Sequence, residues 1–193
     1  QAHLSTDLFG VDIREVLPII REDGSDSAMF DNCFEFLTLT GRPLAHAAMM
    51  MVPAPWEKYT EMSSSLRAFY EFHSHLMDAW DGPAAMAFTD GVQVGAMLDR
   101  NGLRPARYLV THDGLVVLAS EAGALSVPAA NIRMQDRLQP GRMLLVDTAE
   151  GRLYSDEEIK RLVADQYPYR AWIDQLRIEI DSPQRDDVRR LIA

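Results

Sequence analysis

The sequence has a single cysteine, Cys33, so no disulfide can form within the chain and a reducing compartment, the cytoplasm, is expected. Basic residues are scarce, because 19 Lys and Arg stand against 29 Asp and Glu and leave a formal net charge of −10. This charge disfavours nucleic acid and anionic membranes as partners. Apolar runs are also short. The longest, residues 44–56, contains two prolines and a histidine and falls below the roughly 18 residues of a membrane span.

The common signatures of catalysis are missing as well. There is no Cys-X-X-Cys, His-Glu-X-X-His or Gly-X-Ser-X-Gly motif, and neither of the usual glycine-rich phosphate-binding patterns. His73 and His75 are two residues apart on a predicted helix and therefore point in different directions. The other histidines, His3, His46 and His112, are scattered, so we predict no metal site. Cys33 lies among apolar residues of a helical stripe, where a buried thiol is inert. We assign no catalytic residue in this chain.

The first and last parts of the sequence have helical periodicity. Residues 12–20 carry a stripe that Pro18 interrupts, residues 24–41 begin with capping residues and end at a glycine, and residues 63–80 repeat the apolar pattern. The tail opens with Ser155 as a cap and acids in the first turn. We therefore expect helices near 26–40, 64–80 and 156–175.

Between these helices the apolar period changes to two. Three times, two short apolar runs flank an Asp-Gly or Glu-Gly step, at residues 90–91, 113–114 and 150–151. That arrangement predicts β-hairpins, and residues 84–154 should therefore form mostly antiparallel strands. Helices followed by hairpins and another helix indicate a layered α+β fold.

Two short stretches offer candidate sites. In "DRNGLRPARY", residues 99–108, an Asn-Gly step favours a turn, and three arginines could grip an anion or pair with carboxylates such as Asp99 or Glu121. In "GSDS", Ser25, Asp26 and Ser27 stand at the start of a helix, where backbone N–H groups are free. One of the three can cap the helix, or Asp26 can accept hydrogen bonds from a ligand ammonium. The pattern leaves both possibilities open.

Several stretches, taken in order, resemble the glutaminase domain of the large subunit of glutamate synthases. They are "DGSDSAMFDN", "GRPLAHAAMMMVPAPWE", "WDGPAAMAFTDGVQVGAMLDRNGLRPARYLVT", "LVVLASEAGAL", "LQPGRMLLVD" and "YPYRAWI". The resemblance implies a class II glutamine amidotransferase with an N-terminal-nucleophile hydrolase-like fold, a four-layer αββα sandwich with antiparallel sheets. Residues 1–178 would be the C-terminal portion of that domain, and residues 179–193 the start of a linker to the following domain.

The resemblance also implies a function and a distribution of site residues. The parent enzyme would hydrolyse glutamine and supply ammonia for reductive amination of 2-oxoglutarate to glutamate, using FMN and an iron–sulfur cluster. Electrons would reach the parent enzyme from a small subunit or from ferredoxin. The nucleophilic Cys, the Asn-Gly oxyanion pair and the carboxylate-binding arginine of the family would lie upstream of Gln1. Of the family's site residues, only the aspartate that holds the α-ammonium of glutamine has a counterpart in this chain, and that counterpart is Asp26. The chain alone should therefore be inactive and should hold no cofactor.

Two other interpretations remain. The chain could be the glutaminase half of another class II amidotransferase, although "WDGPAA" and "YPYRAWI" speak against that. It could also be a non-catalytic remnant that binds a partner or an amino acid. Because it begins with Gln1 rather than Met, we expect a piece of a longer protein or a processed product. In the resembling family, residues 99–108 form a strand–turn–strand element, which favours turn-stabilising arginines over substrate contact.

Overall fold

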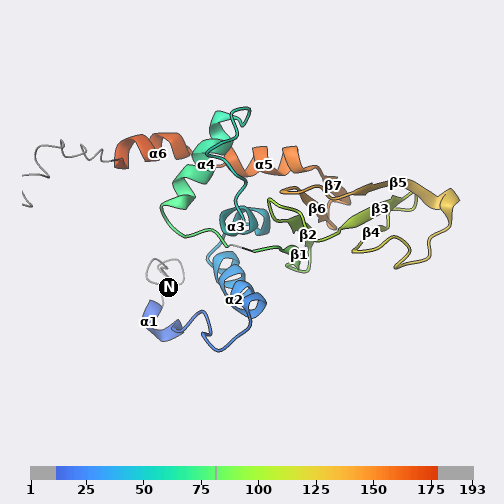
Figure 1. The fold of residues 1–193 in the computed structure, drawn as a ribbon, viewed down its shortest axis with the longest axis horizontal. Helices are drawn as coiled ribbons and strands as arrows, with labels where there is room; N and C mark the ends of the chain where they lie inside the picture. The colour runs from blue at the N-terminus through green and yellow to red at the C-terminus, as the bar shows by residue number, and fades with distance from the viewer. Residues whose placement is uncertain (1–11, 81, 178–193) are drawn as a thin grey trace, which may run out of the picture.

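The computed structural model describes residues 12–80 and 82–177 (Figure 1). Its helices are α1 (Ile13–Val16), α2 (Asp26–Leu39), α3 (Leu44–Met51), α4 (Ser64–Ser74), α5 (Asp156–Ala164) and α6 (Tyr169–Leu176). The strands lie between α4 and α5: β1 (Ala85–Thr89), β2 (Gln93–Leu98), β3 (Arg107–Thr111), β4 (Val116–Ala119), β5 (Ile132–Arg137), β6 (Met143–Asp147) and β7 (Arg152–Tyr154). A 3-10 turn, Ala129–Asn131, leads into β5.

The strands form two antiparallel sheets, as the hairpin pattern predicts. One sheet has the order β1-β2-β6-β7 and the other the order β4-β3-β5. Hairpins β1–β2, β3–β4 and β6–β7 turn at the three predicted steps, where Gly91, Gly114 and Gly151 have φ of 91°, 90° and 62°. Only glycine adopts such angles without steric cost. The prediction of antiparallel strands over residues 84–154 is confirmed.

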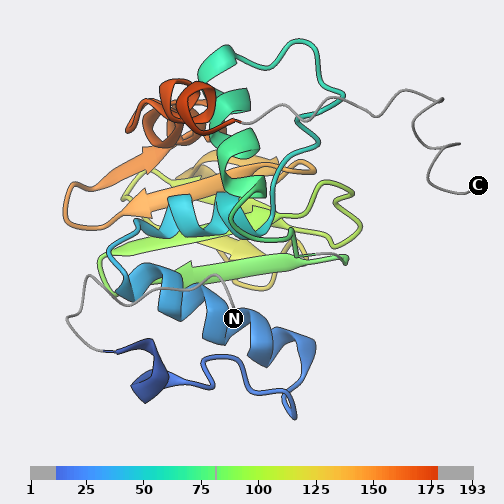
Figure 2. The same ribbon diagram turned by 90° about the vertical axis from the view of Figure 1, so that its left-hand side faces the viewer.

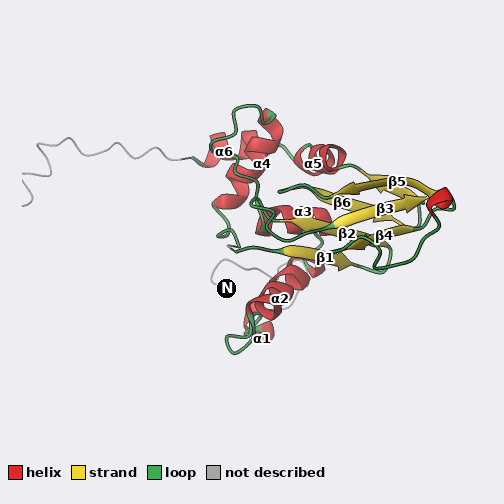
Figure 3. Cartoon of the chain, turned by 45° about the vertical axis from the view of Figure 1, so that its right-hand side comes forward, coloured by secondary structure: helices red, strands yellow, loops and turns green. Residues whose placement is uncertain are grey.

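The described elements stack as one helical layer and two sheets. Figures 1 and 3 show the helices on one side of the four-stranded sheet and the three-stranded sheet on the other. Side chains alternate between the faces of a strand. On β2, Met97 therefore joins the core under the helices, while Ala96 and Leu98 join the core between the sheets. The mixed α and antiparallel β architecture is confirmed. A second helical layer, which would complete the four-layer sandwich, stays a prediction.

Helix α2 lies beside β1, at the edge of the four-stranded sheet (Figure 2). The Phe34 and Phe88 rings meet there, with their centroids 5.3 Å apart. Phe88 stands opposite Gly95 in the β1–β2 ladder, and a Cβ on Gly95 would lie 2.1 Å from the Phe88 ring. A glycine in this strand is therefore what allows the aromatic contact that fixes α2.

The helices differ from the sequence prediction in three places. Helix α3 was not predicted, because all eight of its residues are buried and it has no polar face to create a period. Helix α4 ends at Ser74 rather than near residue 80, and Trp80 instead donates its backbone N–H to Met51 O at 2.7 Å. The predicted helix 156–175 is two helices, because Pro168 begins α6 and disfavours helical geometry at the residue before it.

Candidate substrate-binding site at the head of helix α2

The head of α2 is capped by Ser25, which settles one alternative left by the sequence. Ser25 has extended backbone angles, and its Oγ accepts the Ala28 N–H at 3.3 Å. The hydroxyls of Ser25 and Ser27 are 3.1 Å apart and hydrogen bonded. The preceding loop is fixed to the helix by Asn32, whose Oδ1 accepts the Arg21 N–H at 3.3 Å. The two serines and Asn32 thus order this corner without the carboxylate of Asp26.

Asp26 is the first residue of α2, and its side chain is exposed. Among the described residues, no hydrogen bond or ion pair involves its carboxylate. The positive end of the helix dipole favours a negative charge here by about 0.3–1 kcal/mol. A carboxylate in this position remains available to accept hydrogen bonds from a ligand cation.

The body of α2 is anchored firmly enough to hold Asp26 in place. Cys33 and Leu37 are buried on its inner face, and the Phe30 ring meets Trp80 edge-on with centroids 5.3 Å apart. Burial raises the pKa of the Cys33 thiol, which agrees with its predicted structural role.

Residues 99–108 pass from one sheet to the other through a turn, and the carboxylate of Asp99 stabilises it. Asp99 is buried, and its carboxylate accepts the N–H groups of Ala84 at 3.2 Å and Asn101 at 2.9 Å. Gly102 has φ of 58°, and a Cβ there would lie 2.5 Å from Pro140. Among the described residues, no ion pair joins Asp99 or Glu121 to Arg104 or Arg107. The turn was predicted correctly, whereas the predicted pairs of Arg104 and Arg107 with these two carboxylates are not found among the described residues.

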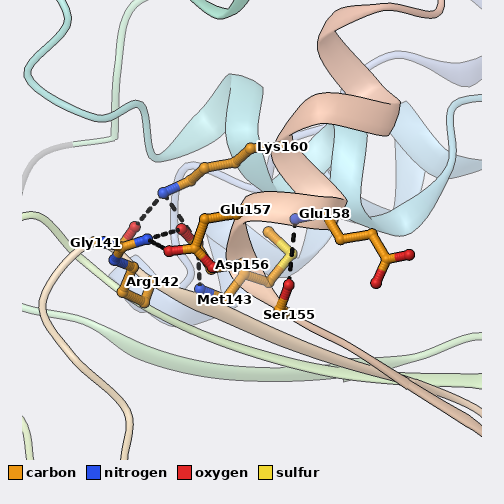
Figure 4. Close-up of polar contacts among 8 residues, drawn as sticks. All are labelled: Gly141, Arg142, Met143, Ser155, Asp156, Glu157, Glu158 and Lys160. Carbon is orange, nitrogen blue, oxygen red and sulfur yellow. Dashed lines mark hydrogen bonds and ion pairs between the residues drawn. The ribbon is translucent and has the colours of Figure 1, made fainter. Parts of the chain in front are cut away.

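The buried carboxylate of Asp156, at the head of α5, lies at the centre of a network that reaches this turn; Figure 4 shows its contacts with residues 141–143 and Lys160. Asp156 accepts hydrogen bonds from the Met143 N–H at 2.8 Å and from Arg142 at 2.7 Å, and it pairs with Lys160 at 3.0 Å. Lys160 also donates to Gly141 O at 2.8 Å. The Gly141 N–H in turn donates to the Asp99 carbonyl at 2.9 Å. These contacts connect the head of α5 with the 99–102 turn and make both structural.

The structure brings together two histidines that the sequence left unconnected. His46 of α3 and His73 of α4 are buried, with their Nε2 atoms 3.0 Å apart. His73 Nδ1 lies 2.8 Å from Phe69 O, so it carries the proton, and its Nε2 accepts the His46 Nε2–H. Burial lowers the pKa of each imidazole to about 4. The two histidines are 27 residues apart in the sequence. Apolar periodicity describes one helix or strand at a time, so it does not reveal this contact.

The described part of the chain contains no group of three or more His, Cys, Asp or Glu residues arranged to hold a metal ion. His75 is exposed at the end of α4, and its Nδ1 lies 2.6 Å from Glu71 O. His112 is also exposed, and His3 lies outside the described residues. Each helix of the described segments is too short or too polar to cross a membrane.

Residues 1–172 match the class-II glutamine amidotransferases, and the chain belongs to that family. Among its relatives are glutamate synthases. The chain is 52% identical over 173 residues to the glutamate synthase [NADPH] large chain of Bacillus subtilis, a match that covers 90% of this chain and 11% of the relative. It is 45% identical over 175 residues to the glutamate synthase [NADH] of Schizosaccharomyces pombe, a match that covers 90% of this chain and 8% of the relative. It is 42% identical over 164 residues to ferredoxin-dependent glutamate synthase 2 of Synechocystis, a match that covers 84% of this chain and 10% of the relative.

The chain thus spans about a tenth of the length of these relatives. The relatives are enzymes, and each is a much longer polypeptide. The resemblance to the glutaminase domain of glutamate synthases is confirmed at the level of the family.

Proposed function

We propose that this chain is the C-terminal portion of the glutaminase domain of a glutamate synthase. The parent protein would hydrolyse glutamine and pass the ammonia to a second site, where 2-oxoglutarate is aminated and reduced to glutamate. The family match and the glutamate synthase relatives support this function. FMN, an iron–sulfur cluster and an electron donor would act in other parts of the parent. The relatives' names include NADPH, NADH and ferredoxin, so the donor is left open.

In this function Asp26 binds the α-ammonium of glutamine. One observation at the head of α2 carries the assignment. Ser25 caps the helix, so the Asp26 carboxylate is not needed as a cap and has no partner among the described residues. A carboxylate that accepts hydrogen bonds from an ammonium forms charge-assisted contacts, which are roughly twice as strong as neutral ones. The residues that attack and cleave glutamine would lie upstream, in the part of the domain that the resemblance places before Gln1.

The test is Asp26→Asn in the full-length protein. The amide keeps the size of the side chain and removes its charge, and Ser25 still caps the helix. We expect glutamine-dependent turnover to fall at least about tenfold, equivalent to roughly 1.4 kcal/mol. The melting temperature should stay nearly fixed, and ammonia-dependent glutamate synthesis should persist.

Asp31→Asn is the matched control, because Asp31 is also an exposed aspartate of α2 but lies beyond its first turn. It should leave the glutamine kinetics unchanged. Unaltered glutamine kinetics in Asp26→Asn would show that Asp26 serves only the helix dipole.

A further inference from the structure

The aspartate at the head of α2 stands at the end of the buried face of that helix. The residues of this face are spaced by four, three and four positions, which is the helical period, and they are Asp26, Phe30, Cys33 and Leu37. The last two belong to the hydrophobic core, Phe30 is half-buried against it, and Asp26 is exposed. The contacts that attach this face to the rest of the domain therefore also determine where the Asp26 carboxylate lies.

Phe30 is the residue of this face nearest to Asp26. Side chains four residues apart on a helix are neighbours, with about 5–6 Å between their Cβ atoms. The Phe30 ring meets the Trp80 ring edge-on, with centroids 5.3 Å apart and planes at 89°. Edge-to-face contact is one of the two arrangements that aromatic pairs prefer. Trp80 thus contacts α2 one turn away from the carboxylate that is proposed to bind glutamine.

Trp80 is itself attached to the core of the domain. Its backbone N–H donates to the carbonyl of Met51, the last residue of α3, at 2.7 Å. Met51 is fully buried, and Trp80 is half-buried against the same core. A second aromatic contact holds α2 further along, where Phe34 meets Phe88 of β1. Of these two contacts, the one with Trp80 is nearer to the head of the helix.

We propose that Trp80 is a positioning residue for glutamine. It holds Phe30 against the core and thereby sets the position of the Asp26 carboxylate. The inference rests on the function proposed for Asp26 and adds to it a residue that does not touch the substrate. Misplacing a binding group by about 1 Å can cost up to about 100-fold in rate. A smaller side chain at position 80 should therefore weaken the use of glutamine while the charge of Asp26 is retained.

The test is a double-mutant cycle of Trp80→Leu and Asp26→Asn in the full-length protein, measured as kcat/KM for glutamine. We expect Trp80→Leu to lower kcat/KM about three- to tenfold, and by no more than Asp26→Asn lowers it. In the Asp26→Asn background, Trp80→Leu should change kcat/KM less than about twofold, because residues that act through one another are not additive. Trp80→Phe keeps an aromatic ring toward Phe30 and should restore most of the activity. Ammonia-dependent glutamate synthesis should persist in every variant.

Trp172→Leu is the matched control. Trp172 is a half-buried tryptophan of α6, and its ring packs on Phe72, Tyr167 and Tyr169 rather than on α2. This substitution should leave kcat/KM for glutamine unchanged even where it lowers the melting temperature as much as Trp80→Leu does. Phe30→Leu removes the same aromatic contact from the side of the helix, so it should reproduce the kinetic effect of Trp80→Leu.

The outcomes separate the role of Trp80 from that of Asp26. An additive cycle, or an equal loss of kcat/KM in Trp172→Leu, would overturn the positioning role. A lowered kcat/KM in Asp26→Asn with unchanged values in Trp80→Leu and Phe30→Leu would also overturn it, and the function proposed for Asp26 would stand. Unchanged glutamine kinetics in Asp26→Asn would overturn the function of Asp26 itself, and the role of Trp80 with it.

Discussion

At the scale of single residues, the His46–His73 pair makes the stability of this domain depend on pH. Both imidazoles are neutral, and burial lowers the pKa of each to about 4. Arg42 also lowers both values, while Gln166 and the Phe69 carbonyl act in the opposite direction. Tyr169 packs against both rings without a charge of its own. An unfolded histidine has a pKa near 6.5, so between about pH 6.5 and 4 the unfolded chain binds more protons than the folded one.

The stabilising contribution of the pair should therefore be complete above about pH 6.5 and should be lost as the pH falls toward 4. Each histidine can contribute a slope of up to about 1.4 kcal/mol per pH unit in this window. Hydrogen exchange of peptides from α3 and α4 in the full-length protein, corrected for the intrinsic exchange rate, measures this loss. His46→Gln keeps a donor for His73 and removes one titrating group, so the slope should fall by about half.

His75→Gln serves as the control for this prediction, because His75 is exposed at the end of α4 and lies outside the pair. It should leave the slope as it is. Stability of α3 and α4 that does not change between pH 6.5 and 4 in the unmutated protein would contradict the neutral-pair assignment.

At the scale of elements, Asp156 joins the head of α5 to the start of β6. Its side chain is only 6% exposed and meets one backbone N–H and two cationic side chains. A hydrogen bond to a charged group contributes about 1.5–3 kcal/mol, and Asp156→Asn removes the charge that holds Arg142 and Lys160. Asp156→Asn should therefore destabilise the domain by about 1.5–3 kcal/mol. Thermal or denaturant unfolding of the full-length protein, followed by exchange of peptides from α5 and β6, would measure it.

Glu157→Gln is the matched control for the Asp156 prediction. Glu157 also pairs with Arg142, but its side chain is 72% exposed. An exposed ion pair contributes roughly 0–1 kcal/mol, so this substitution should have little effect. Equal losses from the two substitutions would mean that Arg142, rather than the buried carboxylate, holds the two elements together.

Local patterns predicted the hairpins because each depends on a glycine step and an alternating period within about fifteen residues. Contacts between distant residues were not predictable in this way. The apolar helix α3 has no alternation of polar and apolar residues to detect. The partner of its residue His46 is His73, which lies on another helix. The sequence placed Asp26 at a helix head but could not decide which residue caps it. Only the backbone geometry, with the Ala28 N–H directed at Ser25, assigns the cap.

At the scale of the whole molecule, the proposed function makes Asp26 one residue of a larger site. Asp26 lies at the head of α2, where its neighbour Ser25 caps the helix and bonds to Ser27. Cys33 lies two turns further along α2 and is buried, and burial raises its thiol pKa, so little thiolate forms at neutral pH. The resemblance places the nucleophile, its base and the oxyanion donors upstream. Under the proposed function, the 193-residue chain would provide a binding carboxylate and a scaffold for a site that other segments complete.

The proposed function also predicts the activity of the isolated chain. The purified 193-residue chain should release no ammonia from glutamine above background, because removing a nucleophile costs several orders of magnitude in rate. In the full-length parent, Cys33→Ser should leave glutamine hydrolysis unchanged, since the buried thiol only packs in the hydrophobic core. Ammonia release is the measurement in both experiments. Turnover by the 193-residue chain at an enzyme's rate would mean that it carries its own catalytic residues. Loss of activity in a folded Cys33→Ser variant would identify the thiol as one of them.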